Sequence, residues 1–229
     1  MICQLCNGEF IPKVKLKELL FPGKIGRAAC CEQCQNKFIR VVPGCPQCSR
    51  SNSGLCQDCL DWQKRYQGDV LVNHSLYEYN EIFHNLMVQY KRYGDYVLRL
   101  TLQDLIKKPL KSWLKDKNYD FYVALPTSPS HKERRQFETV EATFLDLLPL
   151  TKMLEKSDKV SSQGEKNRQE RLATPQSFSF KFELDQIPEN SRILLLDDIY
   201  TTGRTLYHAK DAIRKKLPDA KLDALTICR

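Results

Sequence analysis

Residues 193–205 read Ile-Leu-Leu-Leu-Asp-Asp-Ile-Tyr-Thr-Thr-Gly-Arg-Thr. The four apolar residues at the start are typical of a central parallel strand that helices cover on both faces. In open α/β sheets ligands bind at the carboxyl ends of the strands, where this run places Asp197 and Asp198. The stretch therefore predicts an α/β fold with a parallel sheet and a ligand site at the end of this strand.

The hydroxyl-rich residues that follow predict an anion site. Thr201, Thr202 and Gly203 are expected to form a tight turn into a helix that begins near Thr205. Free backbone N–H groups and the helix dipole favour an anion at such a position. The paired acids can accept hydrogen bonds from two neighbouring sugar hydroxyls, so a sugar phosphate suits the whole run. Helix capping by Asp198 or Thr205 explains single residues, but it leaves the pair of acids without a role.

The run resembles the motif with which type I phosphoribosyltransferases bind phosphoribosyl pyrophosphate (PRPP). The resemblance implies that Asp197 and Asp198 contact the ribose hydroxyls. It implies that the 5-phosphate is held by Thr201, Thr202, Gly203, Arg204 and Thr205. It also implies Mg²⁺ on the pyrophosphate, because this ion prefers hard oxygen ligands and takes many of them from substrate.

A second part of the site is expected earlier in the chain. Residues 121–125 form a β-prone run that Pro126 closes, and a polar, basic loop is expected over 127–136. By the same resemblance this loop binds the pyrophosphate, through Thr127, Ser128, Arg134 and Arg135. The residues by themselves equally allow these basic side chains to be solvated.

Nine of the ten cysteines lie within the first 59 residues, and eight of them form Cys-x-x-Cys pairs. The pairs are Cys3/Cys6, Cys31/Cys34, Cys45/Cys48 and Cys56/Cys59. Such pairs present two sulfurs to a tetrahedral metal, and in a reducing compartment they indicate structural zinc. Consecutive pairing gives two zinc ribbons and interleaved pairing a cross-brace. The order slightly favours the first, and a single filled site is also possible.

The composition bounds the organisation and location of the protein. Residues 1–62 are poor in long apolar runs and are expected to form a zinc-ribbon module, followed by an α/β domain over 63–229. The formal net charge of +8 falls to about +4 with two tetrathiolate zinc sites, which does not by itself argue for nucleic acid. No membrane span or signal peptide is recognisable, so a cytoplasmic location is expected.

Hydrophobic periodicity predicts the remaining elements. Helical spacing is expected within 71–96, and a second amphipathic helix over 97–108 that Pro109 ends. The long hydrophilic stretch 157–175 is expected to be a lid over the site. The other expected elements are a helix over 137–148, a weak strand at 150–154, a strand at 192–196, a helix over 205–216 and a strand at 224–228.

The cysteine pairs and the acid-rich run together resemble the ComF family of late competence proteins, particularly its ComFC-like members. The resemblance covers essentially the whole chain. It implies uptake and processing of single-stranded transforming DNA beside the ATPase ComFA, in the cytoplasm or, through that partner, at the inner face of the membrane. Where the family often carries Arg-Gly-Phe-Asn-Gln, residues 135–139 read Arg-Gln-Phe-Glu-Thr. The difference removes a glycine and adds a carboxylate beside the expected pyrophosphate loop.

Three functions remain open from the sequence. The first is a competence protein whose pocket binds PRPP as a ligand or regulator. The second is an active Mg²⁺-dependent phosphoribosyltransferase with an unidentified acceptor, and the third is a zinc-ribbon adaptor with a vestigial pocket. Because both acids and the Thr-Gly-x-Thr loop are intact, we favour retained binding.

Contact with DNA or a protein partner has two sets of candidate residues, although a solvated surface is the simpler interpretation of the basic set. The basic set is Lys13, Lys15, Lys17, Lys24 and Arg27. The stacking candidates are Trp62, Tyr66, Tyr77 and Tyr79, near Lys64 and Arg65.

Overall fold

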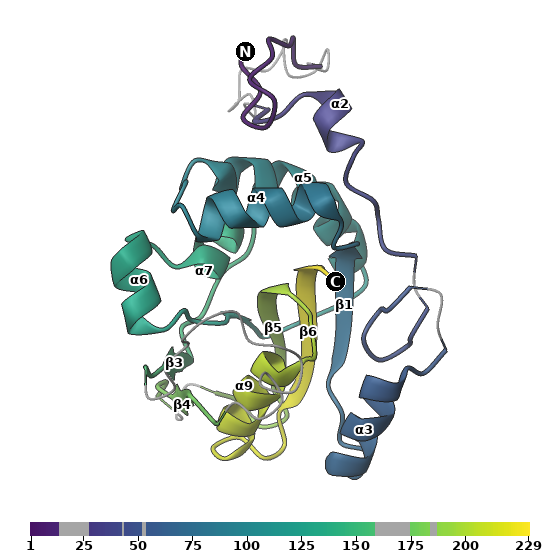
Figure 1. Ribbon diagram of the computed structural model, residues 1–229. Helices are drawn as coiled ribbons and strands as arrows, with labels where there is room; N and C mark the ends of the chain where they lie inside the picture. Colours follow the sequence, from purple (N-terminus) through teal and green to yellow (C-terminus); the bar gives the residue numbers. More distant parts are fainter. Residues whose placement is uncertain (14–27, 43, 52–53, 159–174, 184–186) are drawn as a thin grey trace.

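The computed structural model describes residues 1–13, 28–42, 44–51, 54–158, 175–183 and 187–229. At its centre is a four-stranded sheet in the order β1-β6-β5-β2 (Figure 1). All three neighbouring strand pairs are parallel, which confirms the predicted parallel α/β fold. The strands are β1 (Val72–Tyr77), β2 (Phe121–Ala124), β5 (Arg192–Ile199) and β6 (Lys221–Cys228).

Helices cover both faces of this sheet (Figure 1). One face packs against α4 (Glu81–Lys91), α5 (Leu98–Leu114) and α7 (Thr139–Phe144), and the other against α3 (Gln57–Arg65) and α9 (Arg204–Arg214). Within β5, Leu194 and Leu196 face the first group, whereas Ile193 and Leu195 face the second. The run is continuously apolar because successive side chains enter two different cores.

The short elements complete the framework. β3 (Leu154–Lys156) pairs antiparallel with β4 (Phe178–Phe180), a strand that the sequence did not predict. The other helices within the described residues are α2 (Glu32–Gln35) and α6 (Pro129–Arg135). No helix in the described parts of the chain has the length and apolar character needed to cross a membrane.

The helix expected within 71–96 is α4, but the first part of that range forms strand β1, which was not predicted. β1 carries polar residues on a buried face, and these bond sideways to β6: Asn73 Nδ2 donates to Thr226 Oγ1 at 3.1 Å, and Ser75 Oγ lies 2.8 Å from the same atom. Because the partners of these polar groups come from a strand about 150 residues later, the local pattern concealed the strand.

Two proline positions were also misjudged. α5 does not end at Pro109 but continues to Leu114, and Leu110 beyond the proline is buried in the core. The loop expected over 127–136 contains α6, whose first residue is Pro129. A proline is tolerated there because the first N–H groups of a helix have no intrahelical partner.

The other predicted elements hold with altered ends. The strand at 192–196 extends to Ile199, so the two acids are residues of the strand itself, and the helix over 205–216 is α9. The helix over 137–148 is shorter, as α7, while the strand at 150–154 begins only at Leu154. Nearly all of the expected lid over 157–175 lies outside the described residues.

The two cysteine groups have different surroundings. Cys3, Cys30 and Cys34 form a small cluster with Leu5 and Phe10. The four cysteines from Cys45 to Cys59 belong instead to the hydrophobic core that includes strand β5. The proposed division between 1–62 and 63–229 therefore separates residues that pack together.

Candidate functional site

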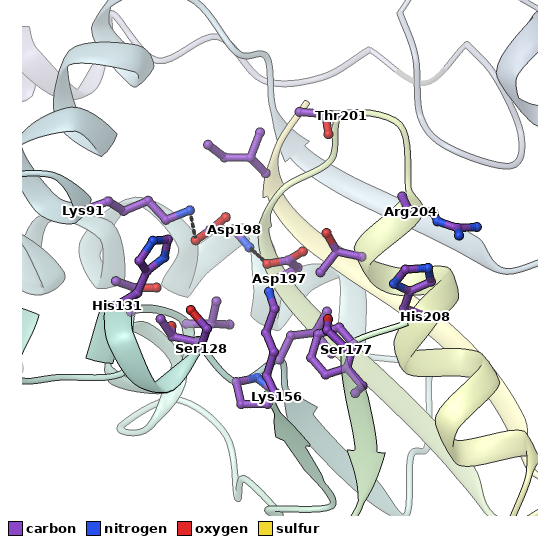
Figure 2. Close-up of a pocket in the computed structure, with 18 of the residues that line it drawn as sticks. Lys91, Ser128, His131, Lys156, Ser177, Asp197, Asp198, Thr201, Arg204 and His208 are labelled. Atoms are coloured by element: carbon purple, nitrogen blue, oxygen red, sulfur yellow. Dashed lines mark hydrogen bonds and ion pairs between the residues drawn. The ribbon is translucent and has the colours of Figure 1, made fainter. Parts of the chain in front are cut away.

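A cavity of about 590 Å³ lies at the carboxyl end of β5, where Asp197 and Asp198 enter it (Figure 2). Its walls come from segments far apart in the sequence. They include the end of α4, α6 with the residues before it, the start of α7, the β3–β4 pair and the loop that leads into α9. The position is the one that the sequence predicted for a ligand site, at the carboxyl edge of a parallel sheet.

The paired acids are held by one another and by lysines. Asp198 is buried, its N–H donates to Asp197 Oδ1 at 2.9 Å, and Lys91 Nζ lies 2.6 Å from Asp198 Oδ2. Figure 2 shows the ammonium of Lys156 directed toward Asp197. Burial and the neighbouring Asp198 charge raise the pKa of Asp197 to about 7, although both lysines oppose the rise.

The loop after β5 has the backbone expected of an anion-binding turn. Gly203 has φ +81°, and a Cβ there would lie 2.5 Å from the hydroxyl of Tyr200. α9 begins at the next residue, so its first N–H groups have no intrahelical acceptors. Thr201, Thr202, Arg204 and Thr205 line the cavity.

The second expected loop is only partly in the cavity. Thr127, Ser128 and Arg135 line it, whereas Arg134 is exposed on α6 and is not among the described lining residues. The Thr127 N–H donates to Glu138 Oε2 at 2.7 Å. The carboxylate that distinguishes this chain from the common family pattern therefore already occupies one backbone donor of the loop.

Gln136 stands where the family pattern often has glycine, and it adopts the left-handed backbone that glycine favours, with φ +66°. Its neighbour Arg135 donates from Nε to the Lys91 carbonyl at 2.6 Å. The left-handed turn is thus retained without glycine. The hydrogen bond from Arg135 next to it connects α6 to α4, the helix that carries Lys91.

Several cavity residues were not predicted. Lys91 is the last residue of α4. Lys156 belongs to a three-residue strand without a recognisable motif, and burial lowers the pKa of its ammonium. Three more side chains with ionisable nitrogen groups line the cavity without having been predicted: His131, His208 and Arg229.

The eight paired cysteines gather into two groups of four, Cys3/Cys6/Cys31/Cys34 and Cys45/Cys48/Cys56/Cys59. In the second group Cys45 and Cys59 Sγ lie 3.6 Å apart, as do Cys48 and Cys56 Sγ. Sulfurs around tetrahedral zinc are about 3.8 Å apart when each bond is about 2.3 Å long. Both groups can therefore hold zinc, with consecutive pairs joined as the sequence slightly favoured.

The candidates for stacking with DNA bases are corrected by burial. Trp62 and Tyr77 lie in the core, and Tyr66 is half-buried with its hydroxyl donating to Asp211 at 2.9 Å. Tyr79 is exposed and lines the cavity. Of the basic candidates, Lys13 pairs with Glu32 at 2.7 Å, and the other four lie outside the described residues.

Comparison with solved structures returns adenine phosphoribosyltransferases. One has 18% identity and a TM-score of 0.34, covering 59% of this chain and 73% of its own. Another, from Saccharomyces cerevisiae, has 17% identity and a TM-score of 0.33, covering 57% and 69%. No protein-family model matches the chain.

Curated relatives extend over nearly the whole sequence. The competence protein ComFC of Bacillus subtilis is 27% identical over 236 residues, which cover 100% of this chain and 95% of the relative. The competence protein ComFC of Streptococcus pneumoniae is 33% identical over 224 residues, which cover 94% of each chain. With this identity over almost its full length, the chain belongs to the ComFC family of competence proteins.

Proposed function

We propose that the cavity binds a phosphoribosyl ligand, PRPP together with Mg²⁺, and that the protein uses this ligand in natural transformation. The observation that supports it best is the convergence of two acids and a helix start on one cavity. The acids offer acceptors to a diol, while the loop 201–205 offers N–H and hydroxyl groups to a phosphate.

The cations around the cavity fit a ligand with several negative charges. Lys91, Arg135, Lys156, Arg204 and Arg229 all line it. When the ribose hydroxyls donate hydrogen bonds to Asp198, the ammonium of Lys91 would move part of its ion pairing from that carboxylate to the ligand's pyrophosphate. Mg²⁺ would shield the pyrophosphate, with oxygen atoms of the ligand supplying much of its coordination.

We propose binding rather than turnover as the role of the pocket. The Thr127 N–H, a donor expected for pyrophosphate, is already engaged by Glu138. Release of pyrophosphate from PRPP, followed with and without single-stranded DNA or nucleotides, tests this choice. Release of more than one equivalent of pyrophosphate per enzyme molecule would instead support the phosphoribosyltransferase alternative.

The cellular role is proposed from family membership. We expect a cytoplasmic protein that acts beside a ComFA-like ATPase on incoming single-stranded DNA, at the inner face of the membrane when bound to that partner. Co-purification with the ATPase, with and without PRPP, tests whether the ligand regulates the pairing. An interaction that PRPP leaves unchanged would separate the pocket from partner binding.

The binding proposal is tested by thermal unfolding with PRPP and Mg²⁺. A ligand at 100 times its Kd stabilises the folded state by about 2.7 kcal/mol, which for a chain of this size raises Tm by roughly 5–10 °C. The double variant Asp197→Asn with Asp198→Asn should lose the shift, because neutral amides are weaker acceptors for the diol. The control carries Asp116→Asn and Asp219→Asn, two exposed acids outside the cavity, and should keep it. Equal shifts in all three proteins would contradict the site.

A further inference from the structure

The loop 201–205, here called the phosphate-side loop, accepts a hydrogen bond from a tryptophan on α3, the helix that follows Cys56. Trp62 Nε1 donates to the carbonyl of Thr202 at 2.8 Å, and only 4% of the Trp62 side chain is exposed. Among the residues that the structure describes, those lining the cavity include Thr202 but not Trp62. Trp62 therefore acts on the loop without contact with the ligand space.

The same tryptophan is fixed to the second cysteine group. It lies three residues after Cys59 on α3, so the two side chains share one side of that helix. Both belong to one buried cluster, with Cys59 fully buried. A metal that fixes Cys59 thereby fixes the start of the helix that carries the indole.

A second contact runs in parallel through Tyr207. Its ring stacks on Trp62, with centroids 4.0 Å apart and an interplanar angle of 19°, and its N–H donates to the Gly203 carbonyl at 3.0 Å. Gln47, which lies between Cys45 and Cys48, donates to the Tyr207 hydroxyl at 3.1 Å. Both Cys-x-x-Cys pairs of this group thus reach the loop and the first turn of α9.

We infer that Trp62 is a positioning residue for the proposed phosphate site and that it couples the second tetra-cysteine centre to phosphoribosyl binding. The peptide bond is planar and trans, so the Thr202 carbonyl and the Gly203 N–H point in opposite directions. Holding the carbonyl therefore also fixes the direction of that N–H. This inference rests on the proposed function for its ligand, although the contact itself does not depend on it.

The test uses Trp62→Phe, which keeps an aromatic ring against Tyr207 but removes the N–H donor. The control is Trp113→Phe, because Trp113 stacks on His74 away from the cavity. Ribose 5-phosphate and Mg²⁺-pyrophosphate are titrated separately by calorimetry. We expect roughly fivefold weaker binding of ribose 5-phosphate to Trp62→Phe, the effect of one ordinary hydrogen bond, and unchanged pyrophosphate binding. Equal weakening of both ligands would indicate general damage and overturn the positioning role, as would no weakening.

Hydrogen exchange separates this inference from the proposed function. If the wild-type protein binds no ribose 5-phosphate, the proposed function fails, but the positioning role still predicts faster exchange at the amides of 203–205 in Trp62→Phe than in wild type or Trp113→Phe. Unchanged exchange would overturn the role whatever the ligand result.

Coupling must also act in the reverse direction, because linkage between two sites is reciprocal. At equilibrium with a colorimetric chelator, ribose 5-phosphate should raise the fraction of zinc that the second centre retains, and the first centre serves as an internal control. In Trp62→Phe this gain should shrink, and the contact through Tyr207 should keep the remainder. A gain of equal size in the wild type and the variant would exclude Trp62 as the coupling residue.

Discussion

At the scale of single residues, Asp197 is a carboxyl group whose ionisation the cavity disfavours. It shares a strand end with Asp198, and burial together with that neighbouring charge raises its pKa to about 7. Lys91 and Lys156 lower the cost of ionisation only in part. A ligand that brings two hydroxyl donors supplies what the protein lacks at this position. The strain on the acid pair is thus consistent with a site built for a diol.

The sign of the pH dependence follows from this raised pKa. Between about pH 4 and pH 7 the folded protein retains a proton that the unfolded chain has lost, so Asp197 lowers stability as pH rises through that window. Ligand binding has the opposite trend, because the ionised acid is the stronger hydrogen-bond acceptor. We expect affinity for ribose 5-phosphate to rise up to about tenfold between pH 6 and pH 7.5.

The ligand's own phosphate also ionises near pH 6, so the comparison needs a control. Calorimetry with Asp197→Asn measures that contribution alone, and its pH dependence should be the shallower of the two. Identical profiles for the wild type and Asp197→Asn would show that Asp197 does not titrate on binding.

At the scale of elements, the turn between β5 and α9 decides the site. It needs the left-handed backbone at Gly203 and also the absence of a side chain, since a Cβ would lie 2.5 Å from Tyr200 Oη. Tyr200 cannot easily move away, because it is buried with the Arg229 guanidinium 4.5 Å from its ring centroid. Backbone conformation and packing therefore both require glycine at this position.

A pair of glycine substitutions separates these two requirements. Gly68 has a similar φ of +89° but open space around it, so Gly68→Ala should cost only the left-handed strain, about 1 kcal/mol. Gly203→Ala should cost about 2 kcal/mol or more, because the steric overlap adds to the strain, and should also abolish the PRPP-induced shift in Tm. Urea unfolding measures both costs, and equal values would show that Tyr200 yields without penalty.

At the scale of the whole molecule, the two cysteine groups differ in their attachment to the sheet. Among the described residues, the first contacts α5 through the Ala29 N–H, which donates to Asp104 Oδ2 at 2.6 Å, and through Gln4, which accepts from Thr101 at 3.1 Å. Leu5 also packs against the edge of the core on that face. The second is part of the core that includes residues of α3, β5 and α9. We therefore expect the first to be dispensable for the sheet and the second to be integral to it.

Selective loss of each centre tests this difference. Cys3→Ser with Cys6→Ser should remove one zinc and leave Tm within about 3 °C of the wild type, since the four cysteines of this group lie in a separate small cluster outside the main core. Cys45→Ser with Cys48→Ser should lower Tm by about 10 °C or more, because structural zinc contributes folding free energy directly to the main core. Zinc content and calorimetric unfolding give the readout, and similar losses of Tm would mean that both centres stabilise the sheet alike.

Much of this protein could be predicted from local sequence. The apolar run with its two acids, the turn with its glycine and the eight paired cysteines each carry their meaning within a few residues. Strand period, helix-start chemistry and metal-ligand spacing are local properties, so β5, α9 and the two cysteine groups were all expected. Arg134 was misplaced because the expected loop forms helix α6, which leaves this side chain exposed, and α5 continues past Pro109 with Leu110 buried in the core.

The distant residues that complete the site became known only from the packing of the segments. Lys91 and Lys156 meet the acids from a helix and a three-residue strand, and Trp62 meets the phosphate-side loop across 140 residues of chain. No local pattern encodes such contacts, because burial and hydrogen-bond partners arise when segments pack. Local sequence shows that acids, hydroxyls and thiolates are present at useful spacings. Packing determined that one cysteine centre stands behind the loop at which the proposed ligand's phosphate would bind.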